Sequence, residues 1–152
     1  MLLQQQIEQD FLVAFKAKEE KMVSVLRLLK TALVNKKIER MVAKDDFLPD
    51  EETISVIKSE VKKRKDSVES YRAGGRADLA AKEEAEIDTL EKYLPEQLSA
   101  EVVAEAVRQT IGELAAGSAD FGKVMGATMK KLGAAADGQL VSRLVKEALA
   151  KT

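Results

Sequence analysis

The 152-residue chain contains neither cysteine nor histidine. Without cysteine it can form no disulfide framework and use no thiolate chemistry, a composition compatible with a reducing compartment. The lack of histidine excludes Ser/His/Asp and Cys/His nucleophilic sites as well as imidazole metal sites. Any catalysis would have to use Asp, Glu, Lys, Tyr or Ser side chains. We therefore expect no catalytic residue, no metal site and no cofactor, and a chain that is not an enzyme on its own.

Long apolar runs are also absent. No stretch reaches the roughly 20 apolar residues of a membrane-spanning helix, and the opening segment, with Gln4, Gln5, Gln6 and Glu8, has no apolar run of signal-peptide length. Apolar residues at 45% and charged residues at 34% argue against a largely disordered chain. The sequence therefore predicts a cytoplasmic protein with no membrane role. The net charge of −1 excludes a globally basic nucleic-acid-binding protein but leaves room for a local basic patch.

Apolar residues recur at helical spacing along the chain, and we find no strand pattern. Pro95 disfavours helical geometry at Leu94, which makes this the best candidate boundary between domains. We predict an all-α protein, with an N-terminal four-helix domain over residues 1–95 and a small three-helix tail domain over 96–152. The predicted helices cover about 2–17, 20–41, 51–72, 78–94, 99–117 and 121–132, with the last one running from 138 onward.

The second predicted helix changes its apolar phase partway along. Its stripe runs cleanly from Met22 to Leu33, but after Val34 the phase is lost, and Ile38 and Met41 begin another. We interpret this change as a bend or an early end of the helix. Residues 20–44 contain seven basic residues against two acidic ones, a local charge of +5, which we interpret as a solvated face balanced by acidic neighbours.

The third predicted helix has a gap in its apolar stripe, where Arg64 and Lys65 stand. The KKRK run at 62–65 has the composition of a nuclear signal or a phosphate patch, but at 100° per residue it encircles the helix and has acidic i,i+4 neighbours, which favours an ion-paired surface. A Gly-Gly turn then forces an antiparallel hairpin. In that register Arg64 or Lys65 should lie near Glu83 or Glu86, and we predict a cross-helix ion pair.

Residues 121–138 predict a helix, a short turn and the start of a last helix. Gly122 and Gly126 form one bare strip on the helix, where another backbone could approach closely. Lys123 and Lys130 share another face, and Lys131 lies beside them. The predicted buried side of this helix consists of Phe121, Val124, Met125, Thr128 and Leu132.

Charge separates within the tail. Residues 96–120 contain five acidic residues against one basic residue, a local charge of −4, whereas residues 121–152 contain six basic residues against two acidic ones, a local charge of +4. The positive charge is therefore concentrated on the last two predicted helices, where it includes Arg143 and Lys146.

Two long segments, together with the amphipathic helix that closes the chain, resemble the YqeY family. The resemblance runs end to end and depends on the combination of GRADL, YLPEQLS and GKVMG. The segments are KKRKDSVESYRAGGRADLAAKEEAEIDTLEKYLPEQLS at 62–99 and FGKVMGATMKKLGAAADGQLV at 121–141.

This family is similar, in turn, to the C-terminal helical and tail region of the B subunit of the glutamine-dependent aminoacyl-tRNA amidotransferase. The resemblance implies the two helical domains predicted above and tRNA as the partner, since that tail is similar to a tRNA-body-binding module. The portions that activate and transfer ammonia are absent. A label of carbon–nitrogen ligase with glutamine as amido-nitrogen donor would be inherited from that neighbour's chemistry.

The candidate RNA-binding residues follow from this resemblance and from the charge pattern. The matching motif runs from Gly122 to Gly126, continues through Lys130 and Lys131, and reaches Gly133 and Gly138. The sequence departs from the family at 134–136, where three alanines occupy a turn that is often more basic in relatives, so the electrostatic attraction is weaker there. The candidates are Gly122, Lys123, Gly126, Lys130, Lys131, Arg143 and Lys146.

The hypothesis is a non-catalytic, tRNA-associated module whose basic side chains contact phosphates, with about five contacts and a salt slope near −4 or steeper. An alternative is a protein-interaction or accessory module of a tRNA-modifying complex, with a partner in tRNA-dependent amidation. Two further readings have less support from the residues, an isolated amidotransferase and a DNA-reading helix-turn-helix. The structural alternative remains that the glycines serve helix packing and the lysines are only solvated.

Overall fold

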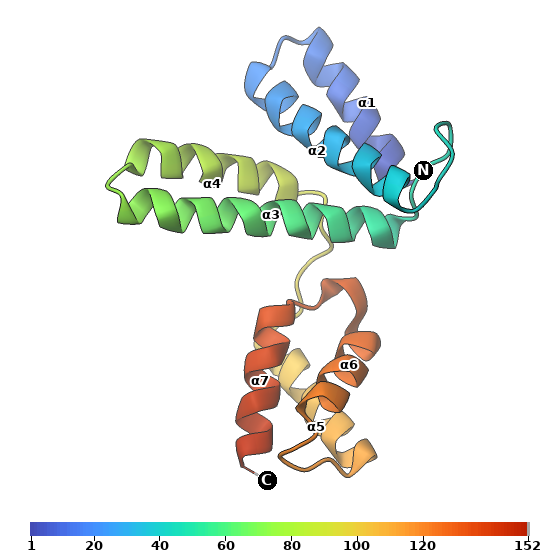
Figure 1. Ribbon diagram of the computed structural model, residues 1–152, viewed down its shortest axis with the longest axis vertical. Coiled ribbons are helices and arrows are strands. Elements are labelled where there is room, and N and C mark those ends of the chain that lie inside the picture. Colours follow the sequence, from blue (N-terminus) through green and yellow to red (C-terminus); the bar gives the residue numbers. More distant parts are fainter. Residues whose placement is uncertain (152) are drawn as a thin grey trace. The chain divides into compact units, whose positions relative to one another are not determined.

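The computed structural model describes residues 1–151, and over this range it contains seven α-helices, one 3₁₀ turn and no strand. This confirms the predicted all-α fold. Each helix begins and ends within a few residues of its predicted limits, because the apolar residues whose spacing predicts a helix are also the residues that pack in the core. The helices are α1 (Leu3–Lys16), α2 (Glu20–Glu39), α3 (Asp50–Ala73), α4 (Ala77–Glu91), α5 (Ala100–Leu114), α6 (Phe121–Leu132) and α7 (Gly138–Ala150), with η1 (Gly133–Ala135) between the last two (Figure 1).

Contacts along the chain divide it into two compact units, Met1–Leu94 and Pro95–Thr152. Each unit has a hydrophobic core of its own. The two are therefore described separately, as the N-terminal unit and the C-terminal unit.

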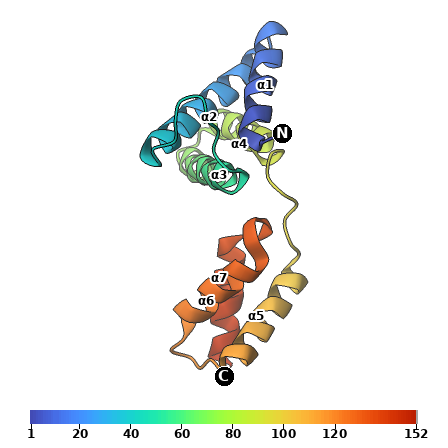
Figure 2. The same cartoon turned by 90° about the vertical axis from the view of Figure 1, so that its right-hand side faces the viewer.

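The N-terminal unit consists of two antiparallel helix pairs, α1 with α2 and α3 with α4 (Figures 1 and 2). Its core includes Leu26, Leu29, Ile57 and Leu90, all of them buried. The buried side-chain carbonyl of Gln4 accepts a hydrogen bond from the backbone N–H of Leu48, at 2.7 Å. This bond fixes the loop between α2 and α3 against α1.

The predicted bend or early end of the second helix is wrong in one respect, because α2 continues to Glu39. The apolar residues that begin the second phase do not turn the chain toward the core. Instead, Ile38 is 70% exposed and Met41 is 92% exposed. Backbone hydrogen bonding continues the helix past the change of phase, so Ile38 is left in solvent on α2, whereas Met41 lies beyond the end of the helix with a φ of 57°.

The predicted cross-helix ion pair is confirmed. Arg64 Nε lies 3.2 Å from Glu86 Oε2 on the facing helix α4, and Arg64 Nη1 also lies 3.4 Å from Glu60 Oε2 one turn back. The guanidinium, which is buried, thus fills the gap in the apolar stripe with a doubly paired charge. Of the three i,i+4 pairs expected along α3, the structure forms Glu60–Arg64.

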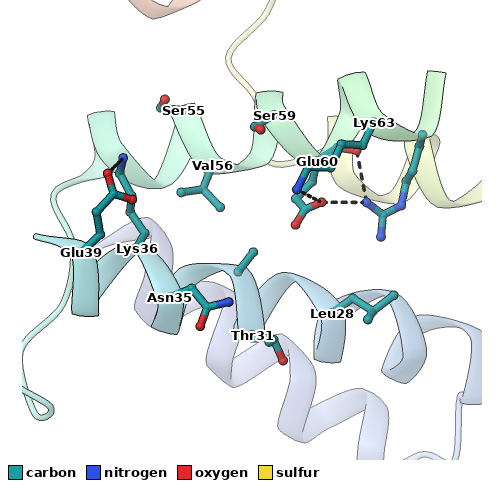
Figure 3. A pocket seen from close by; sticks show the side chains of 12 residues that line it. Leu28, Thr31, Asn35, Lys36, Glu39, Ser55, Val56, Ser59, Glu60 and Lys63 are labelled. Carbon is teal, nitrogen blue, oxygen red and sulfur yellow. Dashed lines mark hydrogen bonds and ion pairs between the residues drawn. The ribbon is translucent and has the colours of Figure 1, made fainter. Parts of the chain in front are cut away.

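A cleft of about 540 Å³ separates α2 from α3 (Figure 3). An ion pair lies near each end of it, Lys36–Glu39 at 3.6 Å and Glu60–Arg64 at 3.4 Å. Hydroxyl and amide groups line its middle beside a few apolar side chains; these residues are Leu28, Thr31, Asn35, Ser55, Val56 and Ser59. The helix pairs of this unit therefore leave a polar trough between them.

The C-terminal unit is a three-helix bundle in which α5, α6 and α7 each pack against the other two (Figure 1). Ser99 caps α5 by accepting a hydrogen bond from the backbone N–H of Val102, and Asp137 caps α7 in the same way from Gln139. Val103, Val124 and Val145 are fully buried at its centre.

Candidate nucleic-acid interface

Helix α6 has two clearly different faces. Val124 and Thr128 are buried against the other helices of the unit, whereas Lys123 and Lys130 are exposed. Seven residues separate the two lysines, which is two helical turns, so their side chains leave the helix in nearly the same direction. Neither lysine has an acidic partner within residues 1–151. The two positive charges are therefore available to a ligand.

The glycine strip, defined as Gly122 and Gly126, lies on this exposed side of α6. A Cβ added at either position would meet no atom within 4 Å. The glycines are therefore not required for helix packing inside the unit, which was the structural alternative in the sequence. They leave a length of α6 backbone uncovered beside the lysines.

Lys131 behaves differently from its neighbours. Its Nζ lies 2.9 Å from Glu113 Oε2 on α5. The lysine thus joins two helices of the bundle, and its charge is partly neutralised. The sequence placed Lys131 beside Lys130 but did not predict this partner, although the acidic segment at 96–120 was a signal that such pairs could form.

The two predicted cations of α7 are also engaged. Lys146 Nζ lies 5.7 Å from the centre of the Phe121 ring at the start of α6, a cation–π distance. Arg143 Nε lies 4.0 Å from Glu147 Oε1 one turn further along, and both side chains are exposed, so this pair contributes little. Lys146 remains exposed and adds positive charge near the first turn of α6.

The turn between α6 and α7 is structural. Gly133 has φ +70° and ψ −153°, a conformation that side chains other than that of glycine strongly disfavour. Ala136 is buried in the core, and the carbonyl of Ala135 accepts a hydrogen bond from the backbone N–H of Leu98 at 3.1 Å. Ala135 and Ala136 therefore help to hold the bundle together.

The acidic charge of the unit lies on α5. Glu101, Glu105 and Glu113 are all exposed. A hydrogen bond from Arg108 and its positive charge hold the pKa of Glu105 below its usual value, so this carboxylate is ionised at neutral pH. One small bundle thus carries an acidic helix and a basic one, and an anionic ligand would be attracted to α6 and repelled by α5.

Residues 1–151 also lack two other kinds of site. No cluster of three or more carboxylate, histidine or cysteine side chains there could hold a metal ion. Within the same residues, no helix has the length and apolar character needed to cross a membrane.

Comparison with known proteins identifies relatives along almost the whole chain. A protein of Pyrenophora tritici-repentis named altered inheritance of mitochondria protein 41, mitochondrial, is 27% identical over 145 residues, which cover 93% of this chain and 77% of the relative. The uncharacterized protein C22F3.15 of Schizosaccharomyces pombe is 33% identical over 99 residues, which cover 64% of this chain and 76% of the relative. The pattern of the YqeY-like protein family matches residues 4–149, and the chain belongs to this family.

Proposed function

We propose that the protein is a non-catalytic RNA-binding module that associates with tRNA through its C-terminal unit. The observation that carries the proposal is the exposed side of α6, where Lys123 and Lys130 lack acidic partners beside a glycine strip that nothing in the bundle covers. Ammonium groups bind phosphate oxygens without reading the base sequence. Such a surface would recognise the shape and charge of an RNA backbone.

The acidic helix α5 restricts the side from which an RNA can approach the bundle. Repulsion from Glu101, which forms no ion pair among residues 1–151, disfavours an approach of the RNA from that side, so phosphates would meet α6 and the neighbouring Lys146. The similarity of the family to the tail of an amidotransferase subunit supports tRNA as the RNA. A glutamine-dependent ligase activity would belong to that larger enzyme and not to this chain.

The structure leaves fewer basic side chains for phosphate contacts than the sequence predicts. Lys131 is paired with Glu113, and Arg143 lies within reach of Glu147, so Lys123, Lys130 and Lys146 are the principal contacts. At roughly 0.9 per phosphate for a duplex, three contacts correspond to a slope of log affinity against log salt of about −2.7. This value is shallower than the slope near −4 or steeper expected from about five contacts.

Filter binding of the full chain to bulk tRNA tests the proposal. Lys123→Ala/Lys130→Ala should weaken binding by about tenfold or more and reduce the salt slope by about 1.8. The matched control is Lys82→Ala/Lys92→Ala, which removes two exposed lysines at α4 and its C-terminal end. If the two double variants bind tRNA with equal affinity, the position of the lysines on the protein does not affect binding, and the proposal is overturned.

A second candidate function is a protein-interaction module of a tRNA-modifying complex, and exposed apolar residues at the end of α2 favour it. Val34, 50% exposed, and Ile38, 70% exposed, lie one turn apart on α2, and Met41, 92% exposed, follows the end of the helix. Under this reading a partner would co-purify after nuclease treatment and would be lost with Ile38→Ser/Met41→Ser. Loss of the partner on nuclease treatment alone would favour RNA instead.

A further inference from the structure

The helix pair α1–α2 carries a cluster of two aromatic rings and two cations, which we call the Phe11 cluster. The rings of Phe11 and Phe15, one turn apart on α1, lie 6.1 Å apart between centres at an interplanar angle of 29°. From α2, Lys30 Nζ lies 4.2 Å from the centre of the Phe11 ring, and the Arg27 guanidinium carbon lies 5.8 Å from it. Both cations are therefore held at an aromatic surface.

Core packing does not account for the whole cluster. Phe11 is half-buried and contributes to the core, but Phe15 is 57% exposed. A phenyl ring left in solvent beside another ring offers a face against which a further planar group can stack. The exposed ring is thus the part of the cluster that the fold itself does not use.

The charges of the cluster are also unsatisfied by the fold. Neither Arg27 nor Lys30 forms an ion pair with any carboxylate in the described part of the chain. The other four arginines of the N-terminal unit are paired: Arg40 with Glu52, Arg64 with Glu86, Arg72 with Glu84 and Arg76 with Asp78. Arg27 differs from these four because its guanidinium lies beside the Phe11 ring and not beside a carboxylate of residues 1–151.

We propose that the Phe11 cluster binds an unpaired RNA nucleotide, with the base stacked on Phe15 and the phosphate contacted by Arg27 and Lys30. Stacking on an aromatic side chain next to basic groups is how proteins hold unpaired nucleotides of any sequence. This site lies in the other unit from the basic side of α6 and does not depend on the function proposed for it. A tRNA offers both kinds of ligand, a duplex backbone and unpaired bases.

A lipid surface and an acidic protein segment are less well matched to this arrangement. A membrane-binding helix presents apolar tips to insert, with cations around them. Leu12 and Val13 are exposed on α1, but Arg27 and Lys30 are held over the Phe11 ring and not around these tips. An acidic peptide would satisfy the charges but has no need of an exposed ring. A nucleotide combines a planar apolar group and an anion within one ligand.

The arrangement recurs two turns along the same helix. Lys37 Nζ lies 6.0 Å from the centre of the Phe47 ring and donates a hydrogen bond to the carbonyl of Lys44 at 2.7 Å. Lys30 and Lys37 are seven residues apart and therefore share one side of α2, about 10.5 Å apart along its axis. A single strand that lies along α2 could reach both lysines.

Photo-crosslinking of the full chain to an oligouridylate that carries 4-thiouridine tests the proposal. The crosslink should map by mass spectrometry to residues 1–16, the segment that contains both rings. Phe15→Ala should abolish this crosslink and weaken binding of the oligonucleotide by about tenfold, whereas Phe15→Tyr should retain both. Arg27→Ala/Lys30→Ala should reduce the salt slope by about 0.7, the value for one phosphate of a single strand.

Three controls separate the alternatives. Ile38→Ser changes an exposed apolar residue of α2 outside the cluster and should leave the crosslink unchanged. Crosslinks confined to residues 121–151, or an unchanged affinity of Phe15→Ala, would overturn the proposal. So would binding to anionic lipid vesicles that requires Phe15 when no crosslink to RNA forms.

The same experiment distinguishes this site from the one in the C-terminal unit. If Lys123→Ala/Lys130→Ala leaves tRNA binding unchanged but the crosslink at 1–16 persists, the function proposed for α6 fails and the Phe11 cluster stands. If the crosslink is absent but the tRNA salt slope falls as expected, the reverse holds.

Discussion

Arg64 and Glu86 join the two helices of the α3–α4 pair across their interface, with Nε and Oε2 3.2 Å apart. The arginine side chain is 9% exposed and that of the glutamate 14%. Arg64 Nη1 also donates to the carbonyl of Glu60 at 3.1 Å, so the guanidinium has partners on both helices. A charge buried to this degree is tolerated only because its donors are satisfied.

Removing the arginine should therefore be costly. Arg64→Ala leaves the carboxylates of Glu60 and Glu86 facing each other at a largely buried interface, and we expect it to lower the free energy of unfolding of the N-terminal unit by about 3 kcal/mol. Hydrogen exchange of peptides from α3 and α4 would measure this. The control is Arg72→Ala, which breaks the exposed pair with Glu84 on the same two helices and should cost about 0.5 kcal/mol. Similar losses in the two variants would contradict the expected role of burial.

The hydroxyl of Thr128 has no hydrogen-bond partner among residues 1–151, although the residue is fully buried in the C-terminal unit. Thr128→Val replaces the hydroxyl by a methyl group of similar size and removes the cost of burying it. We expect the unit to gain about 1 kcal/mol. The matched control is Thr110→Val, in which a buried hydroxyl that donates to Ala106 at 2.7 Å is removed, so a gain of this size should not appear. Exchange rates of peptides from α5 and α6 would report both changes.

Tyr93 sets a pH limit for the N-terminal unit. Its hydroxyl donates to Asp10 Oδ2 at 2.6 Å, and burial, followed by this bond and the charge of Asp10, raises the pKa of the phenol. A raised pKa in the folded state means that the stability contributed is complete below the unfolded pKa of about 10 and is lost as pH rises above it. Urea unfolding between pH 7 and 11 should show this decline in the wild type and in Tyr71→Phe. Tyr93→Phe should lose much of it, and an unchanged profile there would exclude this phenol as the cause.

The helices could be predicted from the sequence because burial and periodicity depend on the same residues. The Arg64–Glu86 pair was predictable for a related reason, since a Gly-Gly turn fixes the register of the α3–α4 hairpin and a charged residue in an apolar stripe needs a partner. Helical periodicity was sufficient to predict the helices, and the short connection was sufficient to predict the ion pair.

Pairs that depend on packing between other helices were not predictable. Lys131 and Glu113 lie on helices joined by a longer loop. The contact of Lys30 with Phe11 was missed although α1 and α2 are joined as closely as α3 and α4, because an aromatic ring in an apolar stripe does not call for a charged partner. The exposure of Ile38 could not be inferred either, because an apolar residue on a helix is expected to be buried until the neighbouring helices are placed. The candidate site was thus predicted as a set of charges, whereas the structure shows that Lys131 and Arg143 have acidic partners within the unit.

A substitution at Gly126 should change the stability of α6 and its proposed RNA binding in opposite directions. The residue is in the helix interior, where glycine costs about 0.5–1 kcal/mol relative to alanine, and a methyl group there would meet no atom within 4 Å. Gly126→Ala should therefore stabilise the C-terminal unit by about that amount, measurable by hydrogen exchange.

If an RNA backbone approaches the glycine strip, the same methyl group should weaken tRNA binding several-fold in the filter assay. Gly112→Ala on α5 is the matched control, because it is equally open and should stabilise the helix without affecting binding. A Gly126→Ala variant that is more stable and binds tRNA as tightly as the wild type would mean that the lysines act without close approach of the backbone.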